Sequence, residues 1–577
     1  MVICMKITSI ISLFVLLLPC YSQAQNANNK VVINLWNDVG RLNPITSTSA
    51  DASYVEDNVF SSLLEYNPKN YQLQTDLATA LPTIATIDTG FYKGGMSLTF
   101  EINKNAVWDN GQPITAHDFI FTVKAIKNPR IEAGSNRPYY TFINDIKIDK
   151  ANERKFTIYS KERYFLAENS AGTLQIMPEY IYDSSRIMRK FNIGDLDTIP
   201  QMKSHNQIIK FAEQFNKLEF SNFTLTGSGA YRFESWKFQD KIVLVRKKDY
   251  WKDKVENPNN KAKYPDTIVY KIAQSFESLQ NAAKNGEIDA ISGVQPQTFD
   301  NWKKDAVIKA NFNFHTPEQF AYDYIGINTK KAGLSEKKVR QALAYLIDKQ
   351  YLINTIYKGY AKSTNSPINP VKTHYHKGLK EREFNLKQAK TLLTEAGWVD
   401  TDSNGILDKT IEGKKIELKF NVKFLKNNQL RKEIAQHFQT NAQKVGISLE
   451  LNGEDRSTLM ENLNSRKYDL NVGAWIQTPD LEDMTQLWHS SSDHYNGSNR
   501  TGFGNAQSDK IIDEIRVCVD KKQRNLLYKE IQTLIADEQP YIFLCVPKER
   551  LIIHKKFSHT QVTANRPNFI PSEFQTK

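Results

Sequence analysis

The fold is decided by one stretch, Val107-Trp108-Asp109-Asn110-Gly111-Gln112-Pro113-Ile114-Thr115-Ala116-His117-Asp118-Phe119-Ile120-Phe121. Asn and Gly tolerate positive φ and Asp bonds its own backbone, so the segment 109–111 predicts a tight turn. Thr115 is a plausible helix N-cap, with Asp118 three residues later as its reciprocal partner. Apolar residues then follow at helical spacing from Phe119. The stretch therefore predicts a strand, a turn and a capped helix, and nothing in it indicates catalysis.

This stretch resembles the signature of the family 5 bacterial solute-binding proteins, the oligopeptide, dipeptide and nickel receptors of ABC importers. Their pattern runs Trp/Phe-x-Asp-Gly-x-Pro-hydrophobic-Thr/Ser-Ala-x-Asp-Val/Phe, preceded by a strand such as the one expected at 96–104. The spacing is intact if Asn110 takes the acidic place before Gly111. One motif of this length is only moderately specific, so further motifs must follow in order.

Further motifs of that family do follow in order. Each is similar in residues and spacing to the corresponding family passage, with Ala230 where a proline is usual and Leu346 where a small residue is usual. They are Gly227–Trp236, Asp249–Trp251, Gly286–Ala290, Tyr324–Thr329, Lys338–Asp348 and Leu386–Trp398. The resemblance thus spans essentially the whole chain after its N-terminal segment.

Length and composition are those of a large soluble protein. The 577 residues are 40% hydrophobic and 24% charged, which predicts two or three lobes with ordinary cores. The net charge of +12 is spread among interleaved acidic residues, so a nucleic-acid surface is weakly supported. We expect no nucleic-acid partner and no cofactor.

The N-terminus has the pattern of a secretory signal peptide. An apolar run at 7–18 follows a basic residue, and Ser22-Gln23-Ala24 offers small residues for cleavage before Gln25. The run is too short to span a membrane. We therefore expect residues 1–24 to be removed and the protein to be periplasmic. Lipidation at Cys20 is an alternative that the preceding proline fits poorly.

Two cysteines, Cys518 and Cys545, remain after that cleavage, and the sequence does not show whether they pair. No cysteine spacing indicates zinc. The segment Asp400–Gly405 begins like a calcium loop, but Ile411 stands where a bidentate Glu is needed, so we interpret it as a surface turn. A metal role for His374 and His376 has little support.

The resemblance implies an α/β fold of two lobes, the large class II type of periplasmic binding protein, with an extra N-terminal subdomain and a hinge between the lobes. The strand and helix order along the chain agrees with a mixed α/β protein. The expected divisions are 25–271 for lobe I with its extra subdomain at about 65–210, 272–545 for lobe II, and 546–577 for the return to lobe I. The crossings would then fall near Ile272 and Cys545.

The resemblance also implies a ligand site at the strand end Trp475-Ile476-Gln477-Thr478-Pro479-Asp480. Peptide-binding members carry Trp-x-x-Asp there, and that Asp pairs with the α-amino group of the peptide. Here Thr478 takes the place of the Asp, which puts free-peptide specificity in doubt unless Asp480 acts instead. Trp475 keeps its place, either stacking on the ligand or serving as a core residue at a strand end.

Two other segments are candidates for the ligand site. Family members donate hydrogen bonds from the loop that contains Thr46 and Ser47, although an ordinary surface turn is the alternative. Tyr322 precedes a lobe II strand and is a candidate to line the cleft. The predicted ligand-binding residues are therefore Trp475, Ile476, Thr478, Asp480, Thr46, Ser47 and Tyr322.

The resemblance implies a monomeric substrate-binding component of an ABC importer, which captures a peptide or similar small solute and delivers it to the membrane permease. No catalytic residue is predicted. A secreted hydrolase is the alternative, with Asp480, Glu482 and Asp483 as a carboxylate cluster, but the serine-hydrolase and zinc-protease motifs are absent from the sequence. A receptor that senses a ligand without importing it is a third possibility.

Overall fold

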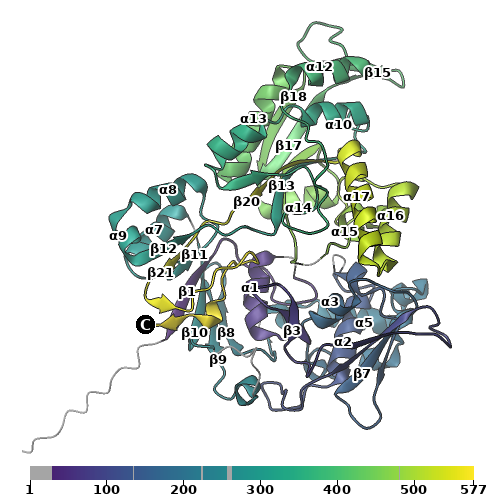
Figure 1. Ribbon diagram of the computed structural model, residues 1–577, viewed down its shortest axis with the longest axis vertical. Coiled ribbons are helices and arrows are strands. Elements are labelled where there is room, and N and C mark those ends of the chain that lie inside the picture. The colour runs from purple at the N-terminus through teal and green to yellow at the C-terminus, as the bar shows by residue number, and fades with distance from the viewer. Residues whose placement is uncertain are drawn as a thin grey trace, which may run out of the picture.

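The structure is a computed structural model that describes residues 29–47, 49–133, 136–222, 225–255, 263–273, 275–479 and 481–577. The expected signal peptide, the alternative lipidation site at Cys20 and the candidate ligand residue Asp480 lie outside these ranges. Within them the chain forms two α/β lobes, one above the other in Figure 1, with an extra subdomain beside the lower lobe. The two-lobe α/β fold predicted from the sequence is confirmed.

Lobe I is built on a mixed sheet of seven strands within the described ranges. β1 (Lys30–Leu35) lies at its centre and pairs in parallel with β10 (Thr267–Ile272) and β11 (Ala290–Ile291). Helices α7 (Phe276–Lys284), α8 (Pro296–Lys304) and α9 (Ala306–Asn311) pack on it. The strand order is β12 (Phe312–His315), β21 (Leu551–His554), β11, β1, β10, β9 (Lys241–Arg246) and β8 (Tyr231–Lys237).

The extra subdomain has a separate antiparallel sheet and shares one continuous apolar core with lobe I. The capped helix predicted from the opening motif is present as α2 (Ala116–Lys127). Thr115 caps it, and the Asp118 side chain accepts from the Thr115 backbone N–H at 3.0 Å. The other elements are α1 (Ala50–Val59), β2 (Leu64–Tyr66), β3 (Leu73–Thr75), β4 (Thr83–Thr86), β5 (Met96–Glu101), β6 (Asp145–Ile148), β7 (Lys155–Ser160), α3 (Ala167–Gly172), α4 (Glu179–Tyr182), α5 (Asn206–Phe215) and α6 (Leu218–Asn222).

Lobe II is built on a second mixed sheet, which has its own core. β13 (Ala321–Ile327) lies inside this sheet and is buried along its whole length. In the described part of the chain the strand order is β14 (Ala361–Ser363), β20 (Tyr541–Pro547), β13, β19 (Leu470–Ile476), β17 (Lys419–Leu425) and β18 (Ser448–Glu454). The hairpin β15 (Asp408–Ile411) and β16 (Lys414–Glu417) projects beyond it.

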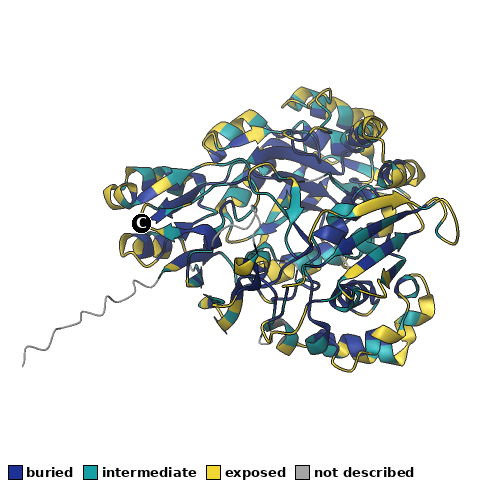
Figure 2. Cartoon of the chain, turned by 60° about the horizontal axis from the view of Figure 1, so that its bottom comes forward, coloured by how far each residue is buried: buried dark blue, intermediate teal, exposed yellow. Residues whose placement is uncertain are grey.

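Helices cover the faces of the lobe II sheet. Figure 2 shows its strands largely buried and the outer faces of the helices exposed. A further apolar cluster lies beneath the helices of residues 485–538 and includes Trp488, Tyr528 and Tyr541. The helices are α10 (Lys337–Ala344), α11 (Lys349–Tyr351), α12 (Leu386–Glu395), α13 (Gln429–Gln443), α14 (Arg456–Asn464), α15 (Thr485–Trp488), α16 (Ala506–Val517) and α17 (Lys521–Glu538).

The first lobe boundary predicted from the sequence, at residue 272, is wrong. β11 and β12 follow that residue and pair within the lobe I sheet, so the chain crosses to lobe II only between His315 and Ala321. The sequence of a short buried strand does not say which sheet it joins. The return crossing, expected near Cys545, lies between Pro547 and Leu551, after β20 ends.

The C-terminal segment returns along lobe I and ends in the short strands β22 (Phe557–Ser558) and β23 (Gln575–Thr576). Residues 563–573 of this segment face α1 and the β2–β3 hairpin across a cavity, and Figure 1 shows the yellow coil passing beside α1. Cys518 and Cys545 are both free.

Candidate functional site

The candidate site is a cavity of about 520 Å³ on the side of lobe I that faces the crossing segments. α1, the β2–β3 hairpin, the start of β8 and the C-terminal segment form its walls. This volume lies within the range of small-molecule sites in proteins. Its aromatic lining consists of Tyr54, Tyr66, Tyr71, Tyr140, Tyr231, Tyr250, Phe60 and Phe569.

One face of α1 supplies functional groups to this cavity. Ser49 caps the helix by accepting from the Asp51 backbone N–H, and the helix then places Tyr54, Asp57 and Asn58 in the cavity wall. Asp57 has accessible surface, yet burial among protein atoms raises its pKa to about 7. Burial likewise raises the pKa of Tyr54 to about 12. Asp57 is thus an exposed residue of the cavity wall that many protein atoms surround.

Several charged groups in the cavity wall pair with one another. The Lys252 ammonium lies 2.9 Å from Asp76 and 3.7 Å from Glu65. Burial lowers the pKa of Lys252, but the two carboxylates outweigh burial and raise it. Burial raises the pKa of Glu65, as does the nearby Asp76. The positive charge of Lys252 is therefore compensated by the carboxylates of Asp76 and Glu65 within the protein.

Lobe II approaches the cavity through Phe320, which lies at the crossing into β13. Its ring centroid is 5.2 Å from that of Tyr71, in an edge-to-face arrangement. The Gln477 backbone N–H donates to the Phe320 carbonyl at 2.7 Å. The end of β19, where the sequence predicted the ligand site, is therefore connected to the cavity wall through Phe320 and Tyr71.

None of the predicted site residues that the structure describes lines the cavity itself. Trp475 is half-buried and packs against the apolar cluster beneath α15–α17. Ile476 is 40% exposed and Thr478 is also exposed, so both are accessible at the end of β19. Asp480 lies outside the described residues.

The residues around Thr478 form a buried charge network. The Glu482 carboxylate accepts from the Lys372 ammonium, from His374 and, at 2.7 Å, from the Gln477 amide. Lys372 also donates to the Thr478 carbonyl at 2.7 Å. Burial raises the pKa of Glu482, but Lys372 and His374 outweigh burial and hold it below its usual value. Glu482 is thus already bound to protein cations.

Thr46, Ser47 and Tyr322 lie away from the cavity wall. Thr46 is 6% exposed, and Ser47 donates to the Glu56 carboxyl at 3.0 Å. Burial raises the pKa of Glu56 to about 8. Tyr322 is 1% exposed, and its hydroxyl has no hydrogen-bond partner among the described residues. These side chains pack inside the lobes in this arrangement.

A polar clasp joins the extra subdomain to lobe II across the interlobe gap. Tyr164 donates to the Asp483 carboxylate at 2.8 Å, and Arg516 forms an ion pair with the same carboxylate. Tyr139 donates to Gln486 at 2.7 Å, and the Phe165 backbone N–H donates to the Arg516 carbonyl at 3.0 Å. The lobes are therefore closed on each other at this edge.

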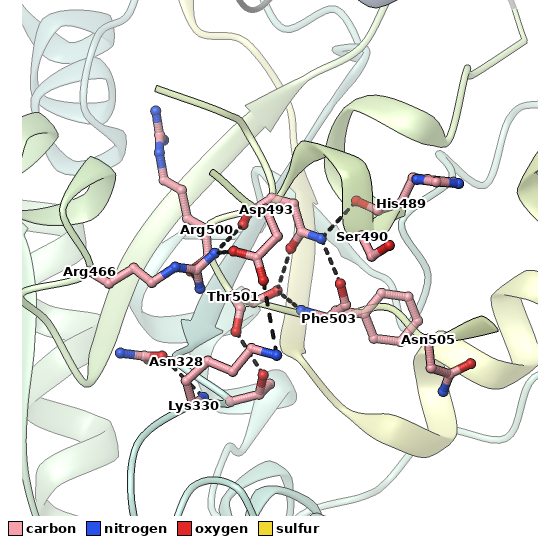
Figure 3. Close-up of polar contacts among 12 residues, drawn as sticks. Asn328, Lys330, Arg466, His489, Ser490, Asp493, Arg500, Thr501, Phe503 and Asn505 are labelled. Carbon is pink, nitrogen blue, oxygen red and sulfur yellow. Dashed lines mark hydrogen bonds and ion pairs between the residues drawn. The ribbon is translucent and has the colours of Figure 1, made fainter. Parts of the chain in front are cut away.

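The loop between α15 and α16 is anchored to the body of lobe II, as Figure 3 shows. Arg466 pairs with Asp493 and donates to the Arg500 carbonyl at 2.9 Å. The Asn499 amide donates to the carbonyls of Phe503 at 2.6 Å and His489 at 3.1 Å. These bonds anchor the loop that directly follows α15. Helix α15 carries Gln486, which accepts the hydrogen bond from Tyr139.

The acidic turn at 400–408 gathers three carboxylates, those of Asp400, Asp402 and Asp408. The Lys415 ammonium lies 2.6 Å from Asp402 and 3.3 Å from Asp408. Asp400 accepts from the Gly405 backbone N–H at 2.9 Å. These bonds are those of a turn, and the three carboxylates lie within 4.8 Å of one another, close enough to hold a metal ion. The interpretation without a metal stays a prediction.

Sequence reasoning missed Asp57, Tyr140 and Arg566, which line the cavity. The available signal was the spacing of Asp51, Tyr54 and Asp57, which puts polar and aromatic groups on one face of α1. No pattern in the sequence placed the C-terminal segment opposite that helix. No helix in the described ranges combines the length and hydrophobicity needed to cross a membrane.

The family model for bacterial extracellular solute-binding proteins, family 5, matches residues 81–497. The oligopeptide-binding protein AppA of Bacillus subtilis is 27% identical over 516 residues, which cover 88% of this chain and 84% of that protein. A solved structure of AppA with a nonapeptide aligns with a TM-score of 0.77 at 24% identity, covering 95% of this chain and 99% of that one. NikZ of Campylobacter jejuni, solved with Ni(L-His), aligns with a TM-score of 0.74 at 21% identity, covering 92% and 95%.

The match to the family model extends over most of the chain, and the solved relatives share its two-lobe fold. The motifs that the sequence presents in order lead to the same assignment. The chain belongs to the bacterial extracellular solute-binding proteins of family 5.

Proposed function

We propose that the protein captures a peptide or similar small solute between its lobes and delivers it to the permease of an ABC importer in the inner membrane. The cavity of about 520 Å³, lined by lobe I, its extra subdomain and the C-terminal segment, is the observation that carries this proposal. Lobe I supplies the cavity, and the clasp stabilises the closed form of the two lobes. In this proposal the bound ligand shifts the equilibrium between the open and closed forms toward the closed form.

The exposed end of β19 has a supporting role in the proposal. Ile476 and Thr478 are accessible and flank Gln477, which contacts Phe320, so they would lie beside a solute held between the lobes. Trp475 would hold this strand end in position by packing beneath it. The protein would act as a periplasmic monomer after cleavage behind Ala24.

The hydrolase alternative is opposed by the state of its carboxylates. Glu482 is bound to Lys372 and His374, and Asp483 is bound to Arg516 and Tyr164. Neither is open to activate water or to protonate a leaving group, and the third member of the predicted cluster, Asp480, lies outside the described residues. A receptor that senses the same solute without import would share the cavity, so binding alone does not separate it from an importer.

The test is native mass spectrometry of the protein isolated from the periplasm of its own cells. We expect a discrete extra mass that is released unchanged on partial unfolding and rebinds on refolding. Deletion of the gene for this protein, or of the genes for the permease that it serves, should then abolish uptake of that compound. A protein without any bound or rebound mass, or one that converts the compound, would refute the proposal.

A further inference from the structure

The C-terminal segment makes a compact turn at residues 562–569, which we call the C-terminal turn. Val562 and Phe569 close it as an antiparallel bridge. Inside it, the Thr563 backbone N–H donates to the Asn568 carbonyl at 2.8 Å, and the Asn568 amide donates to the Thr563 carbonyl at 2.9 Å. The turn is therefore bonded within itself. Its residues that line the cavity are Thr563, Asn565, Arg566, Pro567 and Phe569.

One hydrogen bond ties this turn to the facing wall of the cavity. The Ala564 backbone N–H donates to the Tyr71 hydroxyl at 2.9 Å. Within the described ranges, no other hydrogen bond joins residues 562–569 to the rest of the protein. Phe569 packs in the lobe I core at one end of the turn, so the bond to Tyr71 is what holds the residues around Ala564.

Tyr71 lies in the loop of the β2–β3 hairpin and lines the cavity. Its backbone has a φ of 59°, in the left-handed region that bulky residues rarely adopt. Its N–H donates to the Asn67 carbonyl at 2.8 Å. A bulky residue stays in such a conformation only where the surrounding structure holds it. The contacts of the Tyr71 ring therefore help to fix where its hydroxyl lies.

Phe320 supplies one of these contacts from lobe II. The two ring centroids lie 5.2 Å apart, with an angle of 85° between the rings. Phe320 is fixed to lobe II, because its carbonyl accepts from the Gln477 backbone N–H at 2.7 Å and the Lys372 ammonium lies 5.6 Å from its ring centroid. Opening of the lobes therefore draws this ring away from Tyr71. A gap of about 1 Å already removes much of a dispersion contact, so a small rotation is enough.

We propose that Tyr71 is a positioning residue that couples closure of the lobes to the wall of the cavity. In the closed form, Phe320 holds the Tyr71 ring and the Tyr71 hydroxyl holds the C-terminal turn. In the open form, Tyr71 loses the Phe320 contact, and the turn loses its tie at Ala564. Opening then loosens the cavity wall itself, which gives the solute a wider exit. The inference rests on the proposed function, because capture and release require both forms.

The experiment is hydrogen–deuterium exchange of the full-length mature protein without added solute, resolved to single amides by fragmentation in the mass spectrometer. The Ala564 amide reports the tie to Tyr71. The Thr563 amide is bonded inside the turn and reports unfolding of the turn itself. Phe320→Leu should speed exchange at Ala564 by about threefold or more, the usual effect of losing an edge-to-face aromatic pair. Exchange at Thr563 should stay near its wild-type rate.

The hydroxyl of Tyr71 is tested separately from its ring. Tyr71→Phe removes the acceptor of the Ala564 amide and should speed exchange there at least as much as Phe320→Leu does. The double variant should match Tyr71→Phe alone, because Phe320 acts through the Tyr71 hydroxyl. A purely structural role of the two rings would give additive effects instead.

The clasp provides a way to open the lobes without touching the cavity. The Phe165 amide donates across the clasp to the Arg516 carbonyl at 3.0 Å, so its exchange reports opening. Arg516→Met should speed exchange at Phe165 and at Ala564 together. In the Tyr71→Phe background, the same substitution should speed exchange at Phe165 only.

Two exposed rings of lobe II provide matched controls. Phe384→Leu and Tyr351→Phe make the same chemical changes outside the cavity and should leave exchange at Ala564 at the wild-type rate. Thermal melting checks that every variant is folded.

Three results would overturn the proposal. Phe320→Leu could leave Ala564 at the wild-type rate or speed Thr563 as much as Ala564. Its effect could add to that of Tyr71→Phe. Arg516→Met could speed Phe165 without speeding Ala564. None of these measurements uses a bound solute, so retention of a solute in native mass spectrometry would still support the proposed function.

Discussion

Tyr164 of the extra subdomain donates a hydrogen bond of 2.8 Å to the Asp483 carboxylate of lobe II. Arg516 pairs with the same carboxylate, so one buried acid joins a hydroxyl from one lobe to a guanidinium from the other. The bond crosses the interlobe gap without passing through the hinge strands. It makes the closed form dependent on side chains that have no contact with the cavity.

Arg516→Met is expected to weaken solute binding by speeding release. The change leaves the buried Asp483 carboxylate with hydrogen bonds from the Tyr164 hydroxyl and the Thr485 backbone N–H but without its Arg516 cation. Removing one partner of a buried ion pair typically costs about 3 kcal/mol or more. That cost falls on the closed form, because opening lets water reach Asp483. We expect an affinity loss of about tenfold or more, measured as the release rate of the recovered solute. Lys510→Met, on the exposed face of α16, is the control and should release at the wild-type rate.

Glu56 is expected to make the free energy of unfolding fall as pH rises. Burial raises its pKa to about 8 from 4.5, so between these values the folded protein holds a proton that the unfolded chain has lost. The stabilisation is complete below the unfolded pKa and is lost as pH rises toward 8, by about 1.4 kcal/mol per pH unit. Urea titrations of the wild type and Glu56→Gln should therefore diverge from pH 5 to pH 8, the variant being relatively more stable at the higher pH. Parallel curves would contradict the assignment.

The Lys372–Glu482 pair is expected to show strong coupling. Lys372→Met leaves a buried carboxylate with His374 and Gln477 as its described partners, and we expect a loss of about 3 kcal/mol in the free energy of unfolding. Lys372→Met combined with Glu482→Gln removes both charges and should recover part of that loss. The measurement is a double-mutant cycle by urea denaturation. Additive single losses would show that the two groups act independently.

Much of the fold was predictable, because helix caps and apolar spacing predicted single elements and the order of the family motifs predicted how those elements are arranged. The capping pattern of Thr115 and Asp118 appears as a capping box. The helix predicted at 338–348 is present as α10, which ends earlier, at Ala344. The lobe boundary was not predictable in the same way. β11 and β12 are short, and only their pairing with strands distant in the sequence assigns them to lobe I.

The candidate site was predictable only in part. The end of β19 was chosen from the family pattern, and its role in binding stays a prediction, since Trp475, Ile476 and Thr478 do not line the cavity. The cavity was missed because it forms where α1 meets a segment more than 500 residues later in the chain. Thr46 and Ser47 were predicted because family members bind the ligand from this loop. In the structure Thr46 is buried, and Ser47 donates a hydrogen bond to the buried Glu56 carboxyl.

The most direct test of the account is small-angle X-ray scattering of the stripped protein before and after the solute recovered from its periplasm is added back. The account predicts a decrease in the radius of gyration on addition, with an unchanged molecular mass, and a smaller decrease for Arg516→Met. A radius that stays the same while the solute is demonstrably bound would contradict capture by closure of the two lobes.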